Sequence, residues 1–170
     1  MKALGASLFC LLFAVNEARV FELCELFYLL RSLGLDNYQN IDVKHFVCVA
    51  LFPSKMNTHY YENENGHPYY GIFHLKGTEW CSNGKDKSPN KCTMDCNKLL
   101  DDDIKDDVAC VKQVASSKAG MKSWTHYNDD CTTDVLSYIF MRCTFFFTND
   151  DWYHKIMRLR LPQTMHIQVT

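Results

Sequence analysis

The chain has 170 residues, of which 47% are hydrophobic and 14% aromatic, and its formal net charge is −2. This length and composition suit one packed domain and exclude a disordered chain. The slightly negative charge is not that of a protein that neutralises phosphates, so no nucleic-acid partner is expected.

The first 18 residues have the pattern of a secretory signal peptide. Lys2 gives a positive start, residues 3–15 form an apolar core, and Ala18 is a small residue suited to the position before the cut. An N-terminal buried helix is the alternative. Because the apolar stretch is too short to span a bilayer, we expect a secreted, extracellular protein with no membrane span.

The cysteine count agrees with this interpretation. Of the nine cysteines, Cys10 lies in the signal segment and would leave with it. Eight remain, and an even number in a secreted chain of this size implies four disulfide bonds. Eight cysteines allow about 105 pairings, so the count leaves the connectivity open.

Two helices are predicted at the start of the mature chain, over residues 22–33 and from 43 to about 52. Apolar residues recur at helical spacing in the first, and Gly34 is a natural stop. Asp42 can cap the second helix. Pro53 ends it, because proline lacks an amide proton and disfavours a helical conformation in the preceding residue.

The following stretch predicts a small sheet and further helices. Residues 60–73 suggest two short strands around a turn with Asn65-Gly66 at its tip. Residues 74–95 are interpreted as a loop. Helices are expected at 105–115, around 121–127 and around 135–141. This order indicates an α+β domain with a helical lobe and a small antiparallel sheet lobe.

The last 27 residues, 144–170, form a C-terminal tail to which the sequence assigns no structure. Its aromatic run, residues 145–147, is too short for a membrane anchor.

Several motifs in the mature chain stand at a recognisable order and spacing. They are Phe21-Glu22-Leu23-Cys24, Gly34-Leu35-Asp36-Asn37-Tyr38, Phe46-Val47-Cys48, Tyr70-Gly71-Ile72-Phe73, Trp80-Cys81 and Leu99-Leu100-Asp101-Asp102-Asp103-Ile104. They resemble landmarks of the c-type lysozyme and α-lactalbumin family, glycoside hydrolase family 22, over residues 19–143. The resemblance implies a lysozyme-like fold with four disulfides, namely Cys24–Cys143, Cys48–Cys131, Cys81–Cys96 and Cys92–Cys110.

Both catalytic carboxylates of that family are replaced in this chain. The family's general acid is a Glu between Phe and Ser, where this chain has Pro53. Its second carboxylate directly precedes a Tyr-Gly-Ile strand, where this chain has Tyr69. Neither residue can supply the acid or the carboxylate of that chemistry, so no catalytic residue is assigned. Glu62 and Glu64 in the nearby hairpin are interpreted as solvated turn residues.

A glycan cleft is a further implication of the resemblance. Trp80 and Trp124 stand at family positions and are its candidates, with core packing as the alternative. His74 is interpreted as a surface or cleft-lining residue without a catalytic role.

Five aspartates lie within residues 101–107. Calcium prefers several oxygen ligands, and a divalent cation offsets the repulsion of clustered carboxylates. A solvated acidic run at the start of a helix is the alternative. The resemblance to the α-lactalbumin loop implies Ca²⁺ as the cofactor. The implied ligands are the side chains of Asp101, Asp106 and Asp107 and the backbone carbonyls of Lys98 and Asp103.

The sequence is best interpreted as a secreted, monomeric, calcium-binding lysozyme-like protein without muramidase activity, which binds a glycan or a protein partner. One alternative is an α-lactalbumin-type regulatory subunit of lactose synthase, with a galactosyltransferase-type partner. Leu51-Phe52, in place of a Phe-His pair, and the lysozyme-like spacing of Cys131 and Cys143 count against it. The other alternative is a c-type lysozyme that hydrolyses peptidoglycan.

Overall fold

The computed structural model describes residues 18–145. The predicted signal peptide, apart from Ala18, and the tail beyond residue 145 lie outside the described residues. The elements are α1 (Leu23–Ser32), α2 (Val43–Leu51), β1 (Tyr61–Glu64), β2 (His67–Tyr70), β3 (Leu75–Lys76), α3 (Gly77–Trp80), the 3-10 helix η1 (Cys96–Leu100), α4 (Lys105–Ser116), the 3-10 helix η2 (Gly120–Ser123), α5 (Tyr127–Asp130) and α6 (Thr133–Phe145).

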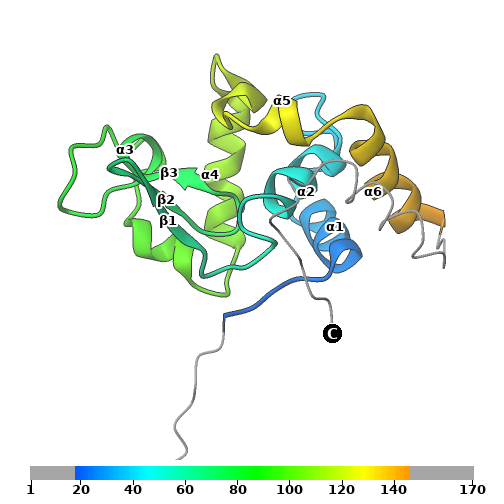
Figure 1. Ribbon diagram of the computed structural model, residues 1–170, viewed down its shortest axis with the longest axis horizontal. Helices are drawn as coiled ribbons and strands as arrows, with labels where there is room; N and C mark the ends of the chain where they lie inside the picture. The colour runs from blue at the N-terminus through cyan, green and yellow to red at the C-terminus, as the bar shows by residue number, and fades with distance from the viewer. Residues whose placement is uncertain (1–17, 146–170) are drawn as a thin grey trace, which may run out of the picture.

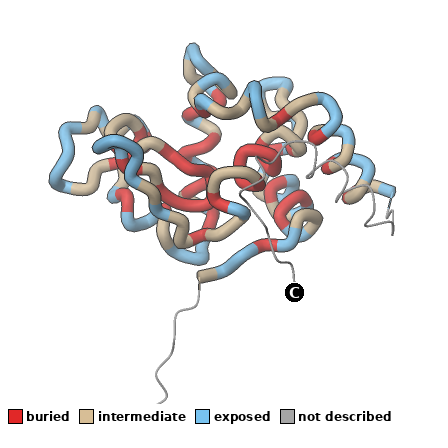
Figure 2. Tube along the Cα trace, viewed as in Figure 1, coloured by how far each residue is buried: buried red, intermediate tan, exposed pale blue. Residues whose placement is uncertain are grey.

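Two lobes are visible in Figure 1, with α4 between them. The helices α1, α2 and α6 pack against one another on one side, and the sheet lies with α3 on the other. The buried segments in Figure 2 run through both lobes and α4, so one core joins them. No helix between residues 18 and 145 is both long and apolar enough to cross a membrane.

The first two helices begin and end close to the predicted residues. Glu22 caps α1 and forms a capping box with Glu25. The Asp42 carboxylate accepts a hydrogen bond from the Lys44 amide at 3.0 Å and caps α2. Because Pro53 cannot continue a helix, α2 ends at Leu51 as predicted.

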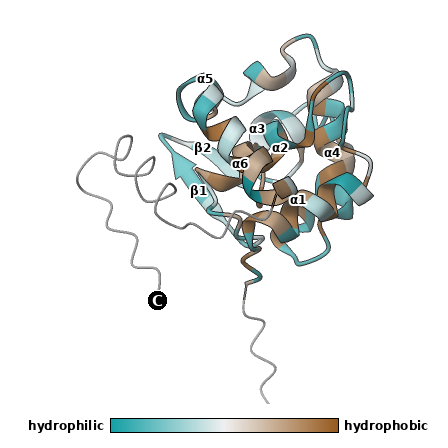
Figure 3. Cartoon of the chain, turned by 90° about the vertical axis from the view of Figure 1, so that its right-hand side faces the viewer, coloured by the Kyte–Doolittle hydropathy of each residue, from teal (hydrophilic) through white to brown (hydrophobic). Residues whose placement is uncertain are grey.

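The sheet is antiparallel, in the order β1-β2-β3. Asn65 and Gly66 form a two-residue turn between β1 and β2, both with positive φ angles, 51° and 85°. Asn-Gly tolerates this conformation, which explains why the hairpin turns there. The edge strand β1 carries hydrophilic colours in Figure 3, and polar edges discourage pairing with a second chain.

Four disulfides connect these elements. The structure pairs Cys24 with Cys143, Cys48 with Cys131, Cys81 with Cys96 and Cys92 with Cys110. These are the four pairs that the family resemblance implies, and the α+β fold is the predicted one.

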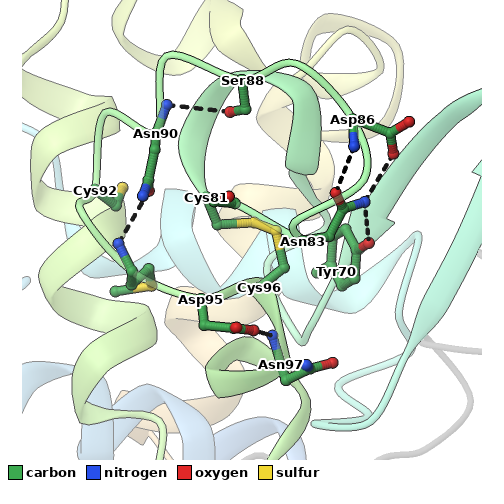
Figure 4. The surroundings of a disulfide bond; sticks show 12 residues. Tyr70, Cys81, Asn83, Asp86, Ser88, Asn90, Cys92, Asp95, Cys96 and Asn97 are labelled. Carbon is green, nitrogen blue, oxygen red and sulfur yellow. Dashed lines mark hydrogen bonds between the residues drawn. A yellow bond between two sulfur atoms is a disulfide. The ribbon is translucent and has the colours of Figure 1, made fainter.

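The Cys81–Cys96 bridge holds the long loop beside the sheet (Figure 4). Near it, the Asn83 side-chain amide donates to the Asp86 carboxylate at 2.7 Å and lies 3.1 Å from the Tyr70 hydroxyl. At the other end of the loop, the Asp95 carboxylate accepts from the amide of Asn97 and caps η1. The loop is therefore fixed by side chains as well as by cysteines.

The structure differs from the prediction in two regions. Residues 74–95, predicted as a loop, contain β3 and α3, which are too short to produce a periodic pattern. The helix predicted around 121–127 is two short pieces, η2 and α5. Trp124 separates them because it adopts an extended backbone and buries its ring.

Candidate functional site

The position of the family's general acid lies just after the end of α2. Pro53 stands there and has no proton to donate. The next residue, Ser54, is buried, and its hydroxyl oxygen lies 2.8 Å from the Ala50 carbonyl oxygen and 2.6 Å from that of Ile72. This serine ties the end of α2 to the segment after β2.

Tyr69 occupies the position of the second carboxylate, in the central strand β2. It pairs across the sheet with Glu62 of β1 and Lys76 of β3. Its ring stacks on the ring of His74, with centroids 4.2 Å apart and planes 8° from parallel. An aromatic surface therefore replaces the carboxylate.

Glu62 is held by two neighbouring side chains. The Tyr60 hydroxyl donates to the Glu62 carboxylate at 2.6 Å, and His74 Nε2 lies 3.2 Å from the same oxygen. The interpretation of Glu62 as a solvated turn residue is therefore wrong, because it lies in β1 and is anchored from two sides. Glu64 also belongs to β1, although its side chain is exposed as expected.

Two histidines meet beside Tyr69. His74 is only 6% exposed, so it lines the cleft rather than the surface, and its ring centroid lies 5.5 Å from that of His126. The pKa of His74 is lowered, mainly by burial and further by the neighbouring His126. Glu62 acts in the opposite direction and raises it. Burial also lowers the pKa of His126, so both rings are neutral at pH 7.

These shifts predict a dependence of folding stability on pH. A histidine whose folded-state pKa is lowered contributes stability above its unfolded pKa, near 6.5, that is lost as pH falls through its folded value. When the pH is lowered from about 7.5 to about 5.5, the free energy of unfolding should therefore fall less for His74→Gln than for the unmodified chain. Urea unfolding in chelator measures this, with exposed His67→Gln as the control. Parallel profiles for His74→Gln and the unmodified chain would contradict the assignment.

A cavity of about 240 Å³ lies between the sheet and the segment that contains η2. Trp80 and Trp124, the predicted cleft residues, line it together with Tyr69, His74 and His126. The Trp124 indole donates to the Phe73 carbonyl oxygen at 2.7 Å, which fixes its ring in the wall. Among the described residues, His126 Nε2 is buried without a hydrogen-bond partner. The cavity thus has aromatic walls, while the His126 Nε2 atom has almost no accessible surface.

The predicted calcium ligands lie in one stretch, from η1 to the first turn of α4. Asp107 is 1% exposed, and its Oδ2 atom has no hydrogen-bond partner in the described part of the chain. Burial raises the pKa of this carboxyl well above its usual value, and the charges of Asp106 and Asp101 raise it further. Such a buried carboxyl is stabilised either by binding a proton or by a neighbouring cation.

The other aspartates of this stretch have protein partners. The Asp101 carboxylate accepts from the Asp103 amide at 2.9 Å, and Asp102 accepts from the Thr58 hydroxyl at 2.6 Å. Within residues 18–145, no three His, Cys, Asp or Glu side chains are gathered as a metal site requires. The set Lys98, Asp101, Asp103, Asp106 and Asp107 remains a prediction.

Gly71 joins the sheet to this acidic stretch. Its φ is +72°, and a Cβ atom there would lie 2.2 Å from the Leu99 carbonyl oxygen and 3.0 Å from Asp107 Oδ1. Gly71→Ala should therefore lower the free energy of unfolding by about 3 kcal/mol or more. Gly66→Ala, with φ +85° and open space around it, should cost only about 1–2 kcal/mol. Denaturant unfolding measures both, and equal losses would show that the close approach is unimportant.

Sequence reasoning missed the contacts of Glu62, His74 and His126. The spacing of Tyr60, just before β1, and Glu62 within it was a usable signal, since residues two apart in an extended chain share a face. His126 gave no comparable signal, because it lines the cavity from the segment between η2 and α5, far from β1 in the sequence.

Comparison with known proteins identifies the family. A profile of the C-type lysozyme/alpha-lactalbumin family matches residues 19–143. The chain is 37% identical over 145 residues to sperm acrosome-associated protein 5 of Mus musculus, covering 85% of this chain and 91% of that protein. It is 36% identical over 127 residues to the milk isozyme of lysozyme C from Canis lupus familiaris, covering 74% and 98%. It is 38% identical over 142 residues to lysozyme C-1 of Anas platyrhynchos, covering 82% and 97%. Profile match and identities together place this chain in the C-type lysozyme/alpha-lactalbumin family.

Proposed function

We propose that this chain is a secreted lysozyme-like protein that binds a glycan in its cleft without hydrolysing it. One observation carries the proposal, namely that the cavity keeps its tryptophan walls while Pro53 and Tyr69 stand where the family has its carboxylates. Binding of a sugar needs a concave pocket with an aromatic surface and a few polar groups. Hydrolysis needs two carboxylates on either side of the scissile bond.

The walls of the cavity support the binding part of the proposal. Tyr69 and His74 form a stacked pair at the cavity, and the aromatic rings of Trp80 and Trp124 complete its apolar lining. A sugar ring has apolar faces that can stack on these aromatic rings. A volume of about 240 Å³ suits one or two sugar rings rather than a long chain.

Binding of the N-acetylglucosamine trimer, followed by calorimetry, tests this proposal. Ser123→Phe should abolish binding, because Ser123 lines the cavity and a phenyl ring would fill it. Ser137→Phe is the matched control, since Ser137 is exposed on α6 and outside the lining. Equal binding by both variants would place the sugar elsewhere and refute the proposal.

We propose calcium binding as a second property of the chain. The buried, unpartnered Oδ2 atom of Asp107 supports it, because a bound cation would offset this charge. Asp101, Asp106 and Asp107 would contribute side chains, and Lys98 and Asp103 would contribute backbone carbonyls. The ion would supply positive charge to the start of α4, and the carboxylates would lose their mutual repulsion.

Secretion belongs to the proposal too. Four disulfides are typical of proteins that fold in oxidising compartments. The signal-like N-terminus is the second argument for export.

A further inference from the structure

We propose that the cavity prefers an anionic sugar, one that carries a carboxylate or a sulfate group, over a neutral one. The inference rests on the proposed glycan binding and names the class of sugar. It is drawn from the charges that line the cavity, which come from β3 and from η2.

Two lysines from different elements contribute to the lining. Lys76 lies in β3, and Lys122 lies in η2. Within the described residues, neither ammonium group forms an ion pair. A negative group bound in the cavity would be attracted by both charges.

The single carboxylate of the lining is already neutralised. Glu79 lies 2.7 Å from the Lys91 ammonium, which also sits over the Trp80 ring at 4.8 Å. His74 and His126 are neutral at pH 7 because burial lowers their pKa. Lys76, Lys122 and Glu79 give the lining itself a net charge of +1, and Lys91, which lies outside the lining, offsets the charge of Glu79.

Other carboxylates lie near the cavity but outside its lining, and those of Glu62, Glu64, Asp129 and Asp130 all act on His126. Glu62 is engaged with Tyr60 and His74, and Glu64 is exposed on β1. The charges of Glu62 and Glu64 favour placing the anionic group away from β1. They thus give the bound sugar an orientation as well as a charge preference.

The replacement at position 69 favours this preference. A carboxylate there would place negative charge in the cavity, whose lining includes Tyr69, and would repel an anionic sugar. Tyr69 brings no such charge to the lining.

Calorimetry with matched tetrasaccharides tests this inference on the purified chain. The probes are an N-acetylglucosamine tetramer, a tetramer that alternates glucuronate with N-acetylglucosamine, and a sulfated N-acetylglucosamine tetramer. We expect at least one anionic probe to bind about tenfold more tightly than the neutral one at about 0.01 M salt, with a smaller ratio at about 0.1 M. The tighter of the two identifies the preferred group.

Single variants assign the preference to the lysines. Lys76→Gln and Lys122→Gln should each reduce the ratio of anionic to neutral affinity by about fivefold. Lys118→Gln is the control, because Lys118 is exposed and outside the lining. Thermal melts verify that the variants fold.

The outcomes separate this inference from the proposal on which it rests. Equal affinity for neutral and anionic probes would overturn the anionic preference and leave glycan binding intact. Binding of none of the three probes would overturn both. A ratio that falls equally in Lys118→Gln would show a general charge effect and would also overturn the assignment.

Discussion

Bacterial cell walls should stay intact when this protein is added to them, even though its fold is that of a lysozyme. General acid catalysis alone contributes about 10²–10⁴-fold to such reactions, and the acid's position holds Pro53. Tyr69 removes the second carboxylate as well. Turbidity of a cell-wall suspension should therefore fall at least about 10²-fold more slowly than with an active relative.

Variants at the two positions provide the controls. Pro53→Glu alone and Tyr69→Asp alone should remain inactive, because retaining hydrolysis uses both carboxylates. The double variant Pro53→Glu/Tyr69→Asp is the one in which turnover can return. Clear lysis by the unmodified protein that disappears in Glu62→Gln would contradict this account. It would show that the carboxylate anchored by Tyr60 and His74 had taken over the chemistry.

Calcium should raise the melting temperature of the protein substantially compared with its value in chelator. A ligand that binds only the folded state adds about 2.7 kcal/mol when its concentration is 100-fold above its Kd. Asp106→Ala should remove most of this effect, because it deletes one implied side-chain ligand. Asp134→Ala, at the start of α6, is the matched control and should keep the full response.

Replacing Asp107 should affect the melting temperature differently without and with calcium. Without calcium, Asp107→Asn should melt at least as high as the unmodified chain, because it removes a buried charge with an unpartnered oxygen. With calcium, it should melt lower than the unmodified chain. Identical melting temperatures of the unmodified protein in chelator and in excess calcium would refute the proposed site.

Local sequence patterns by themselves determined much of this protein. Asp42 and Pro53 bounded α2, because a cap and a missing amide act within one turn of a helix. Asn65-Gly66 placed the hairpin turn for the same local reason. The motifs around the cysteines carry the family resemblance, and that resemblance implied the fold and the four pairs that the structure contains.

Only the tertiary structure decided which side chains meet in and around the cleft. It brought Glu62 to His74, left an Asp107 oxygen without a partner among the described residues, and brought Lys76 and Lys122 into the lining of one cavity. Sequence spacing could not show these relations, because each depends on elements far apart in the chain. The strand register and the packing of η2 against α4 together fix the positions of these side chains. Side-chain burial and charge environment exist only once those elements have packed.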